Sequence, residues 1–297
     1  MTAMSAALIA TAAVLAQQPS TPLFKTGVDL VRIDALVLDD GGPVPGLGPQ
    51  DFEIRDNGVR QSPASVTMVT DVTAAIVLDV SGSMTGERMT LAIDAAQTLL
   101  RELKDTDRFS VVAFGDQVTA VVDSTMSLDE ARAHMGLLRP GGSTALLDAT
   151  FAGILYGDRA PGPKLLLVMT DGRNNVSWLK ARDVIEAARR HETVIYPVAV
   201  ALGPGYQVPG HGPVIRDAAA LLELMARQTG GRVMEAEWNT DLERVFSGIL
   251  REYRQRYIVT FTPESVGTGD GWHTLDVKVK RRGATVRARS QYWAGPN

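Results

Sequence analysis

The sequence predicts an α/β fold, in which a doubly wound, mostly parallel sheet is inserted in a β-sandwich formed by the N- and C-terminal flanks. Two observations predict it. Residues 74–253 alternate short apolar strands with amphipathic helices, whereas residues 27–72 and 254–293 carry the period-two alternation of half-buried strands. The alternating pattern implies a parallel sheet with helices on both faces. Each flank alone is too short for a stable two-layer core, so we expect the flanks to pair with each other.

The N-terminus has the features of an export signal. Residues 6–16 form an uncharged, Ala-rich apolar run, and Val14-Leu15-Ala16 has the small-residue pattern of a signal peptidase site. We expect cleavage after Ala16 and a periplasmic or secreted product; a buried or frayed N-terminal helix is the alternative. The run is shorter than the ~20 residues that span a bilayer, so no membrane span is expected. The predicted segments are a signal peptide at 1–16, the two sandwich parts at 17–72 and 254–293, and the α/β domain at 73–253.

The N-terminal flank reads as strands and hairpins. Residues 28–38 alternate largely with period two and stop at Asp39-Asp40-Gly41-Gly42-Pro43. Residues 51–55 are predicted to form a strand, and Asn57-Gly58, the strongest short hairpin signal, follows them. Residues 59–69 are predicted to form the second strand of this hairpin.

The middle of the chain alternates strands and helices. Helical spacing is clearest where Met89, Ile93, Ala96 and Leu100 fall on one face. The predicted strands are residues 74–80, 109–114, 118–122, 164–169, 194–200 and 232–235, the second and third forming a hairpin. The predicted helices are residues 88–103, 128–138, 145–156, 178–192, 216–228 and 241–253.

Two further segments complete the chain. Residues 202–213 are rich in Gly and Pro and follow a strand, so they are either an irregular surface connection or a loop that selects a partner. In the C-terminal flank, residues 256–262, 273–280 and 284–288 alternate as strands, with Arg282-Gly283 as a tight turn.

Composition excludes several classes of function. The chain has 297 residues, of which 45% are hydrophobic and 22% charged, as in an ordinary globular protein. Its 30 basic and 34 acidic residues give a net charge of -4 without long single-sign blocks, so no nucleic-acid partner is expected. The absence of Cys excludes disulfides, thiolate metal sites and Cys nucleophiles.

Oxygen-bearing side chains gather where predicted strands end. Asp79, Ser81 and Ser83 lie on a turn after an apolar strand and suit a hard divalent cation such as Mg²⁺. Gly141-Gly142-Ser143-Thr144 opens a helix, and Thr170-Asp171-Gly172 follows another strand. These three segments can converge at the carboxyl edge of a doubly wound sheet.

A simpler interpretation is available for each segment, because Asp and Ser also form turns and cap helices. Three segments with suitable oxygens at three strand-to-helix junctions favour a metal site instead. The neighbouring Ser143 could supply the hydroxyl in place of Thr144.

The pattern Asp79-x-Ser81-x-Ser83, then Thr144, then Asp171 resembles the metal-ion-dependent adhesion site of von Willebrand factor type A domains. The resemblance covers about residues 73–253. It implies a Rossmann-like fold in which Ser81, Ser83 and Thr144 coordinate Mg²⁺ or Mn²⁺, with Asp79 and Asp171 acting directly or through waters. One coordination position is then left for an acidic side chain of a protein partner.

The flanks are similar to those of exported bacterial proteins related to this family, first described in Acidobacteria. The shared features include the Asn57-Gly58 hairpin, Thr229-Gly230-Gly231 and Tyr257-Ile258-Val259. This second resemblance implies an architecture and no particular activity.

Signatures of an enzyme are missing from the sequence. Ser81 has Asp79 where a nucleophile elbow requires Gly, and neither a phosphate-binding loop nor a Gly-x-Gly-x-x-Gly helix start occurs. The four His residues lack the spacing of a zinc protease. The sequence therefore favours a non-enzymatic, metal-dependent adhesion module. The alternatives are a structural component of an envelope assembly with a loop-fixing metal, and a metal-assisted hydrolase.

Overall fold

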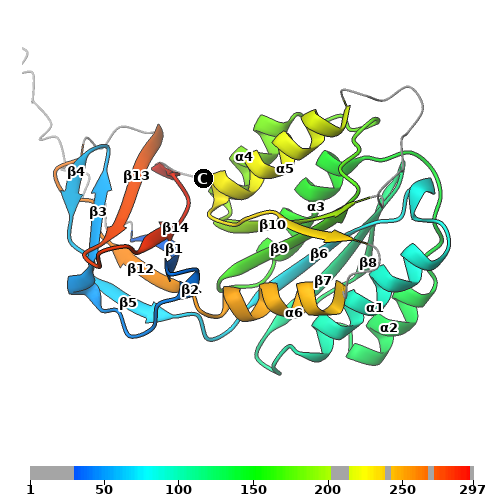
Figure 1. Ribbon diagram of the computed structural model, residues 1–297, viewed down its shortest axis with the longest axis horizontal. Helices are drawn as coiled ribbons and strands as arrows, with labels where there is room; N and C mark the ends of the chain where they lie inside the picture. Colours follow the sequence, from blue (N-terminus) through cyan, green and yellow to red (C-terminus); the bar gives the residue numbers. More distant parts are fainter. Residues whose placement is uncertain (1–29, 202–213, 238–241, 267–270, 295–297) are drawn as a thin grey trace, which may run out of the picture.

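The computed structural model describes residues 30–201, 214–237, 242–266 and 271–294. The predicted signal peptide at residues 1–16 and the Gly/Pro-rich loop at residues 202–213 lie outside the described residues. Figure 1 shows an α/β part built by the middle of the chain and a β-rich part built by both ends. Within the described ranges, no helix combines the length and the apolar character needed to cross a membrane.

The α/β part is organised around one sheet of order β11-β10-β9-β6-β7-β8. Its strands are β6 (Thr73–Asp79), β7 (Arg108–Phe114), β8 (Val118–Val122), β9 (Lys164–Thr170), β10 (Thr193–Ala201) and β11 (Met234–Glu237). All neighbouring pairs are parallel except β7 and β8, which form the predicted hairpin. Every residue of β6 is buried, as expected for a strand covered on both faces.

Helices cover both faces of this sheet (Figure 1). They are α1 (Glu87–Arg101), α2 (Leu128–Gly136), α3 (Leu146–Asp158), α4 (Ala181–Arg190), α5 (Val214–Thr229) and α6 (Leu242–Tyr253). Side chains of β6 alternate between the faces: Ile76 and Leu78 pack with α1, α2 and α6, while Ala75 and Val77 pack with α3, α4 and α5. The sheet with its two helical layers is the doubly wound α/β architecture that the sequence predicts.

The chain ends form two antiparallel sheets. The first has the order β14-β1-β12-β5, with β2 paired to β1, and the second has the order β15-β13-β3-β4. Their strands are β1 (Val31–Asp39), β2 (Gly42–Pro43), β3 (Phe52–Asp56), β4 (Val59–Gln61), β5 (Ser65–Met68), β12 (Tyr257–Phe261), β13 (Gly271–Val279), β14 (Thr285–Arg287) and β15 (Gln291–Ala294). Residues of both sheets, among them Ile33, Ile54, Val259 and Leu275, share one apolar core.

Several local predictions differ from the structure. The single strand predicted at residues 59–69 is wrong, because the chain breaks near Pro63 into β4 and β5, which belong to different sheets. Proline cannot donate to a sheet ladder, which accounts for the break. The strand β15 was not predicted, since four residues are too few to show alternation. The helix predicted at residues 178–192 is shorter in the structure, where α4 spans only Ala181–Arg190.

Arg256 joins the two parts where α6 runs into β12. Its side chain has no exposed surface. Its Nη2 donates to the carbonyl oxygens of Asp34 (2.9 Å) and Arg287 (3.2 Å) in the β-rich part. Its Nη1 donates to Tyr196 Oη of the central sheet at 3.2 Å. One guanidinium therefore bridges β1, the C-terminal flank and β10.

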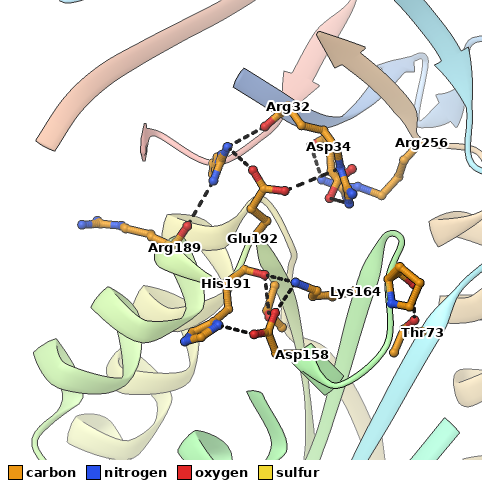
Figure 2. A network of polar contacts seen from close by, with 12 residues as sticks. Arg32, Asp34, Thr73, Asp158, Lys164, Arg189, His191, Glu192 and Arg256 are labelled. Carbon is orange, nitrogen blue, oxygen red and sulfur yellow. Dashed lines mark hydrogen bonds and ion pairs between the residues drawn. The ribbon is translucent and has the colours of Figure 1, made fainter. Parts of the chain in front are cut away.

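Ionic contacts surround this junction (Figure 2). Glu192, in the turn before β10, accepts a hydrogen bond from Arg289 Nη2 at 2.9 Å and lies 3.7 Å from Arg32 Nε. Arg32 also contacts Asp34 Oδ2 at 3.4 Å. Such charge-assisted contacts, partly shielded from water, fix orientation more strongly than exposed pairs do.

Replacement of Arg256 by Met keeps the apolar stem of the side chain and leaves three buried acceptors without their donor. We expect the free energy of unfolding to fall by about 3 kcal/mol, since each of three buried acceptors loses a hydrogen bond worth about 1 kcal/mol. Urea unfolding followed by circular dichroism measures this change. Arg282→Met at an exposed turn is the matched control, with an expected change within about 0.5 kcal/mol. Equal effects of the two substitutions would contradict the role of Arg256.

Candidate metal site

The three predicted segments meet at the carboxyl edge of the central sheet. The strands β6 and β9 are parallel neighbours, so the loops that follow Asp79 and Thr170 begin side by side. The segment before α3 is held against the first loop by two backbone bonds, from Gly141 N to Val80 O (2.8 Å) and from Gly82 N to Gly142 O (3.1 Å). Gly142 has φ +76°, a conformation that favours glycine.

Asp79 ends β6 with a fully buried carboxylate. Its Oδ1 accepts from the backbone N–H of Ser81 (2.9 Å), and its Oδ2 accepts from Thr170 Oγ1 (3.0 Å). Burial raises the pKa of Asp79 to about 6; the hydrogen bonds from Ser81 oppose this shift, and the nearby charge of Asp171 adds to it. Among the described residues, no Lys, Arg or His forms an ion pair with this carboxylate. Its negative charge therefore lacks a protein counter-charge in direct contact.

Ser81, Ser83 and Asp171 form a continuous chain of oxygen atoms. The hydroxyls of Ser81 and Ser83 are 3.1 Å apart, and Ser83 Oγ donates to Asp171 Oδ2 at 2.9 Å. The Asp171 side chain is only 1% exposed. Two loops that are far apart in the sequence thus present hydroxyl and carboxylate oxygens to one another.

Thr144 is buried, and its backbone is held by the loop that follows Asp171. Its N–H donates to Asn175 Oδ1 at 2.8 Å, and its carbonyl accepts from Asn175 N at 3.0 Å. Within the described part of the chain, its hydroxyl makes no hydrogen bond to Asp79, Ser81, Ser83 or Asp171. Of the five predicted residues, four are linked directly to one another, and Thr144 reaches them only through its loop.

Sequence reasoning missed the residues that support this cluster. Thr170 holds Asp79 through its hydroxyl, which also accepts from Gly172 N at 3.0 Å. Asn175 holds the Thr144 segment. The adjacent Thr-Asp-Gly sequence was the available signal for Thr170, whereas the role of Asn175 depends on a loop shape that no local pattern reveals.

The loop at residues 174–179, which bonds to Thr144 and to the start of α3, exposes apolar side chains. Trp178 is 94% exposed and Val176 is 40% exposed. The backbone of Trp178 is nevertheless fixed, because its N–H donates to Asp148 Oδ2 at 3.0 Å. Ser177 Oγ accepts from Leu147 N at 3.0 Å, so the same loop caps the start of α3.

A cleft of about 340 Å³ opens on another side of the cluster. It is lined by Val80 and Gly141, which adjoin the cluster, and by Leu137, Leu138 and Arg139 among others. The cluster thus has a cleft beside it that could receive part of a second molecule.

The donor set has the chemistry that hard divalent ions prefer. It combines two carboxylates with hydroxyl oxygens, and it includes neither nitrogen nor sulfur. Among the described residues, no group of three or more His, Cys, Asp or Glu side chains could hold a metal ion. A metal at this edge of the sheet would therefore depend on Ser and Thr hydroxyls as well as on carboxylates.

Replacement of Asp79 by Asn removes the buried charge and preserves the size of the side chain. In EDTA at neutral pH, we expect the variant to be at least as stable as the wild type, because ionisation of a group with a raised pKa costs stability as the pH rises. Urea unfolding in EDTA measures both free energies, with Asp116→Asn at an exposed position as the charge-matched control. A loss of more than about 1 kcal/mol would contradict this expectation and show that the charged form stabilises the fold.

Comparisons with known proteins identify relatives of the α/β part. The inter-alpha-trypsin inhibitor heavy chain H2 of Mus musculus is 33% identical over 120 residues, which cover 35% of this chain and 12% of that protein. Heavy chain H1 of Sus scrofa is 26% identical over 185 residues, covering 58% of this chain and 19% of that protein. The chain therefore matches only a small fraction of these longer proteins.

Solved structures show the same fold. A von Willebrand factor type A protein from Catenulispora acidiphila has a TM-score of 0.51 and 17% identity, covering 84% of this chain and 74% of that one. Proximal thread matrix protein 1 from the mussel byssus has a TM-score of 0.52 and 17% identity, covering 68% of this chain and 50% of that one. In that structure zinc occupies the metal-ion-dependent adhesion site (MIDAS) motif.

The family model of the von Willebrand factor type A domain matches residues 74–245, which is the part of the chain that forms the central sheet and its helices. Because this match covers more than half of the sequence, the chain belongs to the von Willebrand factor type A domain family.

Proposed function

We propose that this chain is an exported, non-enzymatic module that binds a protein partner by capturing an acidic side chain through a divalent ion. The observation that carries this proposal is the contact between two loops, in which Ser81, Ser83 and Asp171 present their oxygens within hydrogen-bond distance of one another. Asp79 is hydrogen bonded to Ser81, and its carboxylate has no positively charged partner among the described residues. A divalent ion would supply that missing positive charge.

The residues proposed to hold the ion are Asp79, Ser81, Ser83, Thr144 and Asp171, and the ion is Mg²⁺ or Mn²⁺. When bound, the ion supplies a Lewis-acidic position that accepts a carboxylate oxygen of the partner. The protein contributes two carboxylates only, so the bound ion would retain its attraction for a further anionic ligand. Thr144 is the residue proposed to provide the third hydroxyl. Ser143 is the alternative, because the Thr144 hydroxyl is not bonded to the other four residues.

The surroundings of the cluster support binding of a macromolecule. Trp178 is exposed on a loop that hydrogen bonds hold to α3, and rigid exposed Trp residues are frequent anchors of protein interfaces. The cleft beside Val80 and Gly141 offers room for a neighbouring side chain of the partner. Capture of an acidic residue would then be combined with apolar contact at the rim.

We further propose that residues 17–72 and 254–293 form one β-sandwich and that residues 73–253 are inserted in it. The apolar core shared by the two antiparallel sheets supports this division, as do the pairs that β1 and β5 form with β12. The Ala-rich N-terminal run with its small-residue cleavage pattern supports export.

Thermal unfolding tests the metal. We expect Mg²⁺ or Mn²⁺ to raise the melting temperature of the wild type over that in EDTA, since a ligand at a hundred times its Kd adds about 2.7 kcal/mol to the stability. Asp79→Asn should lose this response, and Asp129→Asn, which changes a carboxylate that is 94% exposed and outside the proposed set, should keep it. Identical melting of the wild type in all three conditions would remove the metal from the proposal.

Capture of the partner is a separate test. The whole chain, immobilised and crosslinked in an extract of its own cell envelope, should retain specific proteins with Mg²⁺ and release them in EDTA. Asp79→Asn should retain none of them, whereas Asp129→Asn, at a side chain that is 94% exposed and outside the cleft, should behave as the wild type. Retention of the same proteins in EDTA would argue instead for a structural role in an envelope assembly.

A further inference from the structure

Arg173 places a positive charge against one of the proposed metal ligands. Its Nε lies 3.4 Å from Asp171 Oδ2, the oxygen that also accepts from Ser83 Oγ at 2.9 Å. The backbone N–H of Arg173 donates to Asp171 Oδ1 at 3.1 Å. Both oxygens of Asp171 are thus occupied by groups that donate hydrogen bonds or carry positive charge.

The geometry of the loop directs this contact. Gly172, between the two residues, has φ +85°, so the chain turns sharply after Asp171. The Arg173 side chain is 30% exposed, and its Nη2 is buried without a hydrogen-bond partner. At 3.4 Å, the contact from Nε to Asp171 Oδ2 is longer than a charge-assisted hydrogen bond. It is therefore mainly one of charge.

We propose that Arg173 is an internal cation that competes with the divalent ion for Asp171 and so weakens metal binding. This inference rests on the proposed function. Without Arg173, the cluster would have the two negative charges of Asp79 and Asp171; with it, the net charge nearby is halved. A divalent ion must displace the guanidinium from Asp171 Oδ2 or bind beside it against electrostatic repulsion.

The second arginine near the cluster has a different position. Arg88 Nη1 donates to the carbonyl oxygen of Ser83 at 3.0 Å, on the backbone of the loop. The carbonyl is not among the oxygens proposed to bind the ion. Arg173, by contrast, lies 3.4 Å from Asp171 Oδ2, a proposed ligand atom.

Isothermal titration of the whole chain with MgCl₂ or MnCl₂ alone tests this inference. We expect Arg173→Gln to bind the ion about tenfold more tightly than the wild type, since the partly exposed charge is screened by solvent but not abolished. Arg173→Lys keeps the charge and should bind within about twofold of the wild type. Arg182→Gln removes an equal charge from a side chain that is 81% exposed and should leave the affinity unchanged.

Ionic strength provides a second readout. The gap in affinity between wild type and Arg173→Gln should narrow as the Debye length falls from ~10 Å at about 0.1 M salt to ~3 Å at about 1 M. Unchanged or weaker binding by Arg173→Gln, with folding verified by its melt in EDTA, would overturn the inference while leaving the metal site intact. Absence of metal binding from the wild type and every variant would refute the proposed function itself.

Discussion

The buried carboxylate of Asp79 is the constraint around which the carboxyl edge of the sheet is organised. It ends a strand that is buried at every residue, so water cannot solvate it, and the bonds from Ser81 and Thr170 are its compensation. A charge in such a place is costly unless a partner neutralises it. Groups whose ionisation is opposed by burial are concentrated at functional sites, where binding requirements outweigh stability. Thr170, whose hydroxyl bonds this carboxylate, therefore affects both the ionisation of Asp79 and the geometry of the sheet edge.

Much of this edge was predictable because parallel strands leave little freedom in where their ends lie. Asp79 and Asp171 directly follow, or end, apolar strands, and strands paired in parallel bring their carboxyl ends together. The support from Asn175 was not predictable, since it depends on a loop that turns back over α3. Arg256 was equally hidden, because its acceptor at Asp34 lies 222 positions away in the sequence. The break between β4 and β5 is marked in the sequence by Pro63, because proline cannot donate to a sheet ladder.

One loop carries the exposed Trp178 and holds the Thr144 segment. Asn175 binds the Thr144 segment, and Trp178 N–H binds Asp148 at the start of α3, so residues 174–179 are attached at both ends. Side chains on such a loop lose little conformational freedom when they meet another surface, which lowers the entropic cost of association. A large apolar side chain such as that of Trp178 gains nothing for folding from contact with water. A role in recognition would account for its exposure.

The pairing of β5 with β12 has a mechanical consequence. Met68 lies opposite Tyr257, so the strand that leads toward the α/β part and the strand that returns from it are hydrogen bonded side by side. A pulling force applied between the ends of the described chain would enter at β1 and leave at β15, loading the antiparallel ladders of the β-rich part. The α/β part branches off between β5 and β12 and would stand outside the line of tension. Load carried by the β-rich part would then leave the carboxyl edge of the central sheet, where β6 and β9 end, undistorted.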